Sequence, residues 1–211
     1  MNQKLLEQIK KHANSFGFEW EVCAAFIQVE SAGKGFDSRT KKIMIQFEPS
    51  WFKKKATAEF KYYQELLKKS NHTDLEKQYI KDWKEVLANK VLVQSKEWPA
   101  FNKAFKINPD AAMESTSIGL GQIMGFHYKR LGYRTVGAMW DDAKKGEDRQ
   151  IWQMLKFLDT DTRMKKAIKD KNWHLIATYY NGSGYQALAK RLGREPYNIS
   201  MEKAYNKFKN A

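Results

Sequence analysis

Cysteine is almost absent from this 211-residue sequence, which contains only Cys23. A single cysteine cannot form an internal disulfide, and such low usage is typical of a reducing compartment. Cys23 lies in an apolar stretch, so we interpret its side chain as part of the core rather than as a nucleophile. The four histidines show no spacing typical of a metal site. The sequence therefore predicts neither a bound metal nor a cofactor.

Long hydrophobic runs are absent as well. No stretch approaches the roughly 18 consecutive apolar residues that a membrane-spanning helix needs. Residues 1–20 have the periodicity of an amphipathic helix and lack the continuous apolar core of a signal peptide. We therefore expect the chain to start in the cytoplasm of the cell that makes it and to need another component for any export.

Positive charge, in contrast, is abundant. The chain has 38 Lys and Arg residues against 24 Asp and Glu residues, a formal net charge of +14. Such a charge attracts nucleic acid, anionic lipid or an acidic cell surface, and it does not select among them. Hydrophobic residues make up 42% of the chain, a globular composition. No linker or repeat divides the sequence, so we expect a single domain over residues 1–211.

Apolar residues recur mostly with helical spacing. The exception is FDSRTKKIMIQFEPSW, in which a polar turn precedes the β-branched and aromatic run KIMIQF. We interpret this segment as a short β-hairpin closed by Pro49. The sequence thus predicts a mainly α fold, a helical bundle with one small β-hairpin. Helices are expected near residues 1–20, 19–30, 50–98, 120–131, 147–158, 161–170, 172–180 and 200–209. Apolar anchors are expected within the third of these helical regions at Trp51, Phe60, Leu66, Leu67, Ile80, Trp83 and Leu87.

The stretch AAFIQVESAG places a carboxylate, Glu30, at the end of an apolar run. On a helix at about 100° per residue, Glu30 shares a face with Phe26 and Ile27. Burying an unpaired carboxylate is costly, so such a group finds a partner or takes up a proton. Glu30 is then either a helix-end residue that reaches solvent or backbone, or an acid kept protonated for chemistry. The stretch taken alone favours the first interpretation.

Three other segments combine groups that suit a sugar chain. Glu48 ends the predicted strand, and STSIGLGQIMGF and ATYYNGSGY contain glycines, amides and aromatic rings. Glycine lets a backbone approach a ligand, while amides bind hydroxyls and aromatic faces stack on sugar rings. Glycoside cleavage needs one protonated carboxyl and usually a second carboxylate. Glu30 and Glu48 fit this need, although the spacing alone equally favours a surface role for Glu48.

Taken in order, these motifs resemble the N-acetylmuramidase family of phage endolysins, within the lysozyme-like superfamily. The matching segments run from about residue 18 to 187 and are AFIQVESAGKGF, IMIQFE, STSIGLGQIMGF and YNGSGY. Each motif is weakly specific, whereas the ordered set is strongly specific. Two features depart from the family pattern. Ile118 stands where the family has an aromatic residue, and residues 53–95 are lysine-rich and helical rather than rich in glycine and proline.

The resemblance implies an α+β lysozyme-like fold with the hairpin next to the catalytic helix. It implies that Glu30 is the general acid and Glu48 the second carboxylate, acting on water, as a nucleophile or on the oxocarbenium ion. It also assigns sugar binding to Ser117, Gln122, Tyr180 and Asn181. As alternatives, Gln122 or Asn181 joins loops and a tyrosine of the Tyr179–Tyr180 pair belongs to the core. We expect one of these tyrosines to be buried and the other to face the cleft.

The function implied is hydrolysis of the β-1,4 bond between N-acetylmuramic acid and N-acetylglucosamine in peptidoglycan, by a phage or prophage lysis enzyme. The nearest alternative is a lytic transglycosylase, which uses the same Glu and closes an anhydro ring. A basic nucleic-acid-binding protein is a remote alternative, since no recognition motif is present. We expect a monomer without nucleic acid and without a separate wall-binding domain, acting in the periplasm after release by a holin-type membrane partner.

The C-terminal segment SMEKAYNKFKNA combines an apolar face with lysines. Met201, Tyr205 and Phe208 follow helical spacing. We expect this face to pack on the domain. The alternative is a basic amphipathic helix that docks on anionic outer-membrane lipid.

Overall fold

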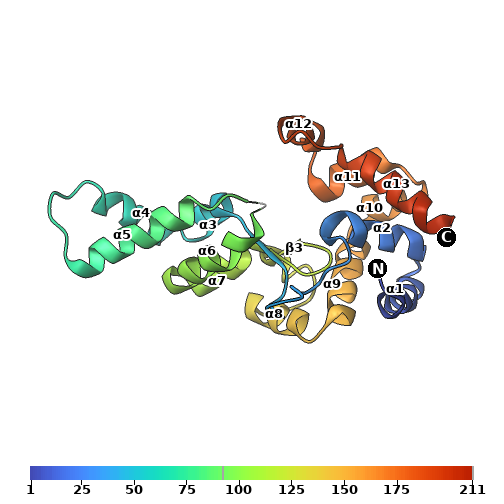
Figure 1. The fold of residues 1–211 in the computed structure, drawn as a ribbon, viewed down its shortest axis with the longest axis horizontal. Coiled ribbons are helices and arrows are strands. Elements are labelled where there is room, and N and C mark those ends of the chain that lie inside the picture. The colour runs from blue at the N-terminus through green and yellow to red at the C-terminus, as the bar shows by residue number, and fades with distance from the viewer. Residues whose placement is uncertain (92, 211) are drawn as a thin grey trace. The chain divides into compact units, whose positions relative to one another are not determined.

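The computed structural model describes residues 1–91 and 93–210, which form two compact units (Figure 1). Unit 1 contains residues 1–42, 119–121 and the chain from 145 onward, and unit 2 contains residues 43–118 and 122–144. Thirteen α-helices and three short strands occur in the described residues, which confirms the predicted mainly α class. None of these helices is long and apolar enough to cross a membrane.

Unit 1 is built around helix α2 (Trp20–Ser31), which packs against α1 (Gln3–Phe16) and α13 (Tyr197–Lys209). Figure 1 shows α2 and α13 side by side, although the sequence places them at opposite ends of the chain. All helices of this unit except α12 were predicted. The others are α9 (Glu147–Asp159), α10 (Thr162–Lys169), α11 (Trp173–Asn181) and α12 (Tyr185–Arg191).

Helix α2 carries the candidate acid at its C-terminal end. Its middle residues are fully buried, and burial of Cys23 raises the pKa of that thiol, as expected of a core side chain. The helix ends where Ala32 (φ 52°) and Gly33 (φ 76°) adopt the left-handed conformation. Glu30 therefore lies in the last turn, where it is half-buried.

Helix α13 packs its apolar face on α2, as predicted. Met201 is fully buried, and the ring of Phe208 lies 6.2 Å from that of Trp20. Polar contacts flank this face: the Tyr205 hydroxyl donates to Glu19 at 3.1 Å. The helix is therefore part of the core of unit 1.

Unit 2 contains a helical region whose core is one buried tryptophan. Helices α4 (Thr57–Leu66) and α5 (Asp74–Leu87) form a hairpin (Figure 1), and Trp83 is fully buried. The rings of Phe52, Phe60 and Tyr63 lie 5.1, 5.3 and 5.5 Å from its ring. The prediction that Trp51 and Leu67 are core anchors is wrong, since these side chains are 37% and 50% exposed. The other helices are α3 (Pro49–Lys55), α6 (Gln94–Ile107), α7 (Pro109–Glu114) and α8 (Val136–Lys144).

The sheet of unit 2 differs from the predicted hairpin. Strand β1 (Ile45–Phe47) lies within the predicted β run, but it pairs antiparallel with β2 (Thr116–Ile118), which pairs with β3 (Ile123–Met124). The helix predicted at 120–131 is wrong, because that segment holds β3 and the 3-10 helix η1 (Gly125–His127). Its glycines disfavour a helix, and β3 instead pairs with β2 across the short loop of residues 119–122. Only the partner of β1 lies far away in the sequence, where no local pattern reveals it.

Candidate active site

The carboxyl of Glu30 is paired with a tyrosine of a distant helix. Tyr197, the first residue of α13, is 9% exposed, and its hydroxyl donates a hydrogen bond to Glu30 Oε1. Pro196 precedes Tyr197 and caps α13 in an extended conformation. The packing of α13 on α2 therefore holds the two side chains together.

Burial raises the pKa of the Glu30 carboxyl to about 7, because the charged form is poorly solvated. The hydrogen bond from Tyr197 and the positive charge of Arg194 lower this pKa and oppose the effect of burial. The pKa of Tyr197 is raised well above its usual value, first by burial and then by the Glu30 charge. The tyrosine therefore stays a donor, and Glu30 holds a proton close to neutral pH.

Tyr180 connects this pair to the core of unit 1. Its ring stacks near that of Tyr197, with centroids 6.2 Å apart, and contacts Phe26 at 4.8 Å. Its hydroxyl donates to the Gly121 carbonyl at 2.6 Å. Tyr180 and Tyr179 are both half-buried, so the expectation that one of them is buried is wrong. Both residues lie in the last turn of α11, about 100° apart, and neither faces fully inward.

Asn181, the last residue of α11, is exposed. It follows Tyr180 directly and lies in unit 1 with Glu30. An exposed amide at a helix end can hydrogen-bond with a ligand at little desolvation cost.

Two glycines of the motif STSIGLGQIMGF lie in the loop Gly119–Gly121, where larger residues would not fit. Gly119 has φ 69°, and a Cβ added there would lie 2.8 Å from the Gln150 side chain. That side chain accepts a hydrogen bond from the Leu120 amide at 3.0 Å. The glycines therefore let the loop lie against α9 and present the Gly121 carbonyl to Tyr180.

Glu48 lies in unit 2, at the N-cap of α3. Its amide donates to the Ser115 carbonyl at 2.9 Å, and its Oε1 accepts a hydrogen bond from Gln46 Nε2 at 3.0 Å. The side chain is half-buried. Glu48 is therefore oriented by its own strand and keeps surface exposed to solvent.

Two predicted sugar-binding residues lie on the neighbouring strands. Ser117 faces Gln46 across β1 and β2, and its hydroxyl donates to Gln122 Oε1 at 3.0 Å. Ser117 is only 4% exposed, whereas Gln122 is half-buried with φ 46°. Unit 2 thus brings Glu48, Ser117 and Gln122 together around Gln46. The Ser117–Gln122 bond also fits the alternative in which Gln122 joins loops.

Two residues that orient the carboxyls, Gln46 and Tyr197, were not predicted from the sequence. Gln46 alternates with the buried Ile45 and Phe47, so strand periodicity places it on the same side as Glu48. Tyr197 is far from Glu30 in the sequence, and no local pattern connects them. Only the packing of α13 on α2 reveals this contact.

A half-buried acid beside a tyrosine donor, together with hydrogen-bonding amides and hydroxyls, suits proton transfer to an oxygen leaving group. Within residues 1–91 and 93–210, no group of three or more His, Cys, Asp or Glu side chains is placed to hold a metal ion.

Comparison with known proteins gives a family match and a structural match. The family described as N-acetylmuramidase matches residues 19–209 of this chain. A crystal structure of a Burkholderia AP3 phage endolysin matches with a TM-score of 0.73 and 27% sequence identity, over 98% of this chain and 71% of that chain. No curated protein matches the sequence.

Proposed function

The chain belongs to the N-acetylmuramidase family, and from this membership we infer that it is a glycoside hydrolase that acts on peptidoglycan as an endolysin. The bond cleaved is the β-1,4 bond between N-acetylmuramic acid and N-acetylglucosamine. The observation that carries a catalytic assignment is the pairing of Glu30 with Tyr197, in surroundings that raise the pKa of Glu30 to about 7.

We propose that Glu30 is the general acid. Its carboxyl gives a proton to the glycosidic oxygen while the bond from that oxygen to C1 of N-acetylmuramic acid breaks. Positive charge then develops on C1 and on the ring oxygen. Water supplies the hydroxyl that ends on C1, and its remaining proton restores the acid. A raised pKa supports this role because the proton is still present near neutral pH.

We propose Glu48 as the second carboxylate, which stabilises the positive charge, attacks C1 or activates water. Replacing Glu48 by Gln removes the charge and keeps the shape, so we expect kcat to fall by about 10²-fold or more with little change in KM. Steady-state cleavage of soluble glycan strands measures both constants. A variant with nearly unchanged kcat would reduce Glu48 to an ordinary residue at the end of a strand.

Four residues are proposed to bind the sugar chain. Tyr180 and Asn181 belong to unit 1, and Ser117 and Gln122 belong to unit 2. Their hydroxyl and amide groups suit sugar hydroxyls and N-acetyl groups. We propose that residues 1–211 form a single catalytic domain.

The products test hydrolysis against its alternative. We expect mass spectrometry of purified peptidoglycan treated with the protein to detect fragments that end in a reducing N-acetylmuramic acid. A lytic transglycosylase leaves 1,6-anhydro ends instead, lighter by one water. Fragments with anhydro ends only would replace hydrolysis by transglycosylation, and intact peptidoglycan would overturn the proposed function.

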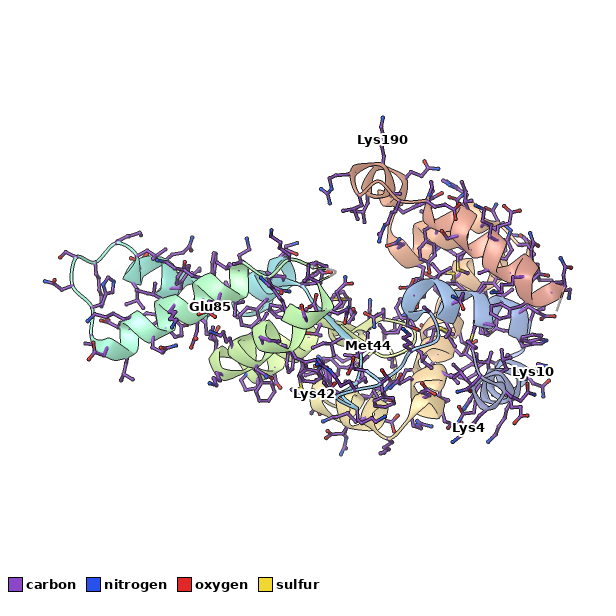
Figure 2. The ribbon with its side chains drawn as sticks, in the orientation of Figure 1. Lys4, Lys10, Lys42, Met44, Glu85 and Lys190 are labelled. Carbon is purple, nitrogen blue, oxygen red and sulfur yellow. The ribbon has the colours of Figure 1, made fainter. Side chains whose placement is uncertain are left out.

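Binding to nucleic acid finds little support in the distribution of charge. Lys4 and Lys10 project from α1, whereas Lys190 projects from α12 (Figure 2). Basic side chains are thus spread over several helices, without a recognition motif.

The compartment in which we propose the protein acts follows from its proposed role as an endolysin. The protein is proposed to be made in the host cytoplasm and to act as a monomer on peptidoglycan in the periplasm after release by a holin-type membrane partner. Contact of basic side chains with anionic outer-membrane lipid belongs to the same proposal.

A further inference from the structure

One tryptophan of unit 2 is exposed without an evident structural reason. The other six tryptophans of the chain are buried or half-buried, whereas Trp51 is 37% exposed. It lies in the first turn of α3, and its amide donates to the Glu48 carbonyl at 3.0 Å. Leaving an aromatic ring in water forfeits hydrophobic stabilisation. An exposed ring this close in sequence to the proposed second carboxylate therefore requires an explanation.

The ring is held in place by a second aromatic side chain. Phe126 lies 4.7 Å from Trp51 between ring centroids, at an interplanar angle of 43°. Phe126 follows Gly125, where an added Cβ would lie 2.0 Å from the Met113 carbonyl oxygen. Only glycine lets η1 approach α7 this closely. The glycine and phenylalanine that end the motif QIMGF thus serve to present Phe126 to Trp51.

Each of these rings is in contact with a lysine side chain. The Lys54 ammonium lies 4.6 Å from the centroid of Trp51, and the Lys55 ammonium lies 5.4 Å from that of Phe126. Lys55 also forms an ion pair with Glu114 at 2.6 Å. Lys54 is exposed, and a cation–π contact in water is weak. A ligand that stacks on Trp51 therefore displaces the flexible Lys54 side chain at small cost.

We propose that the rings of Trp51 and Phe126 form a subsite for an amino sugar of the glycan strand. In this subsite, Lys54 binds a carboxylate carried by that sugar. The proposal rests on the proposed function. Sugar C–H groups are weakly positive and suit the negative face of an aromatic ring. Muramic acid adds a negative charge, from the lactyl group when it is free or from the stem peptide when it is attached. The Trp51 ring complements the C–H face of the sugar, and the Lys54 ammonium beside it complements the negative charge.

Binding is tested with the Glu30→Gln variant as background, so that strands stay intact. The probes are glycan strands with stem peptides, strands stripped of peptides, and a neutral chito-oligosaccharide, measured by calorimetry. We expect Trp51→Ala to raise Kd about tenfold for all three probes, and Trp51→Tyr to recover most of the loss. We expect Lys54→Gln to weaken the charged strands only. If Lys54→Gln loses affinity for the peptide-bearing strands, Lys54 binds the stem-peptide carboxylate. If it loses affinity for the stripped strands, Lys54 binds the lactyl carboxylate.

Phe105→Ala is the matched control, because Phe105 is an aromatic of the same unit with 40% exposure. It should leave all three Kd values unchanged, and thermal melting shows that each variant is folded. Loss of one stacking contact predicts a larger than twofold increase in Kd. If the folded Trp51→Ala variant keeps Kd within about twofold of the Glu30→Gln background, the proposed subsite is overturned. Failure of the wild-type protein to cleave walls overturns the proposed function instead, and leaves the three Kd comparisons interpretable.

Discussion

At the scale of single residues, the Glu30 carboxyl is subject to opposing influences. Burial raises its pKa, while the Tyr197 hydroxyl and the Arg194 charge lower it. The resulting pKa of about 7 keeps the acid protonated without holding the proton too strongly to transfer. We therefore propose that Tyr197 is a positioning residue, which acts by orienting Glu30.

Tyr197→Phe tests this part. The variant keeps the ring and removes the donor, so the carboxylate loses a stabilising hydrogen bond and the pKa of Glu30 rises. Because the protonated carboxyl is the active form in the proposed mechanism, we expect the alkaline limb of the kcat–pH profile to move to higher pH. We also expect kcat to fall while KM changes little, since the carboxyl is less well oriented. Cleavage rates of soluble glycan strands between about pH 5 and pH 9 measure both effects.

Tyr205→Phe is the control for that experiment. It removes a hydroxyl of the same helix that also bonds to a glutamate, Glu19. Its pH profile should match that of the wild type. An unchanged alkaline limb in Tyr197→Phe would contradict the positioning role.

Glu30 also makes stability depend on pH. Folded Glu30 keeps its proton up to about pH 7, whereas a glutamate with the usual pKa of 4.5 has lost it. Glu30 binds more protons in the folded state between these values, so the contribution of Glu30 to stability is greatest below pH 4.5 and falls as pH rises toward 7. Glu30→Gln cannot ionise, and we expect its Tm to exceed that of the wild type by more at about pH 8 than at about pH 4. Calorimetric Tm values test this, and a difference independent of pH would contradict it.

At the scale of elements, helix α13 both fills the core of unit 1 and brings Tyr197 to Glu30. Met201 is fully buried in the contact with α2. We expect deletion of residues 200–211 to lower Tm, and to reduce lysis of intact and outer-membrane-stripped cells in proportion. Met201→Ala alone should cost about 2–5 kcal/mol of stability.

Lys203→Gln separates charge from packing. Lys203 is exposed and pairs with Glu195, so its loss changes the charge and leaves the core intact. We expect its Tm to stay close to that of the wild type. Unchanged Tm after deletion of residues 200–211, with loss of lysis on intact cells only, would favour the membrane role over packing.

The elements also show what a sequence pattern can and cannot reveal. Helical periodicity predicted α13, which buries a regular face, and an apolar run predicted α2, whose residues 22–27 are buried on every side. Periodicity mistook β3 and η1 for a helix, although β3 pairs with the nearby β2 across residues 119–122. The pairing of β2 with Ile45–Phe47 joins segments far apart in the chain, which no local pattern shows. Trp51 was taken as a core residue because side-chain type does not report on exposure.

At the scale of the whole molecule, the proposed site residues follow from the order of four motifs rather than from local structure. The geometry adds what this order could not provide: the Tyr197 donor of Glu30 and the Gln46 donor of Glu48. Both contacts join a glutamate to a side chain that the motifs alone gave no reason to select. The net charge of +14 fits an acidic wall polymer as substrate but does not identify it.

The central claim is that Glu30 supplies the proton for cleavage of peptidoglycan, and release of reducing ends from purified walls by Glu30→Gln tests it most directly. Glu21→Gln is the matched control, the same change on the same helix at a residue that pairs with Lys209. We expect Glu30→Gln to be folded and to lose about 10²-fold or more of the activity, while Glu21→Gln keeps it. Folded Glu30→Gln protein with more than about a tenth of the wild-type rate would contradict the account, since an amide cannot donate the proton.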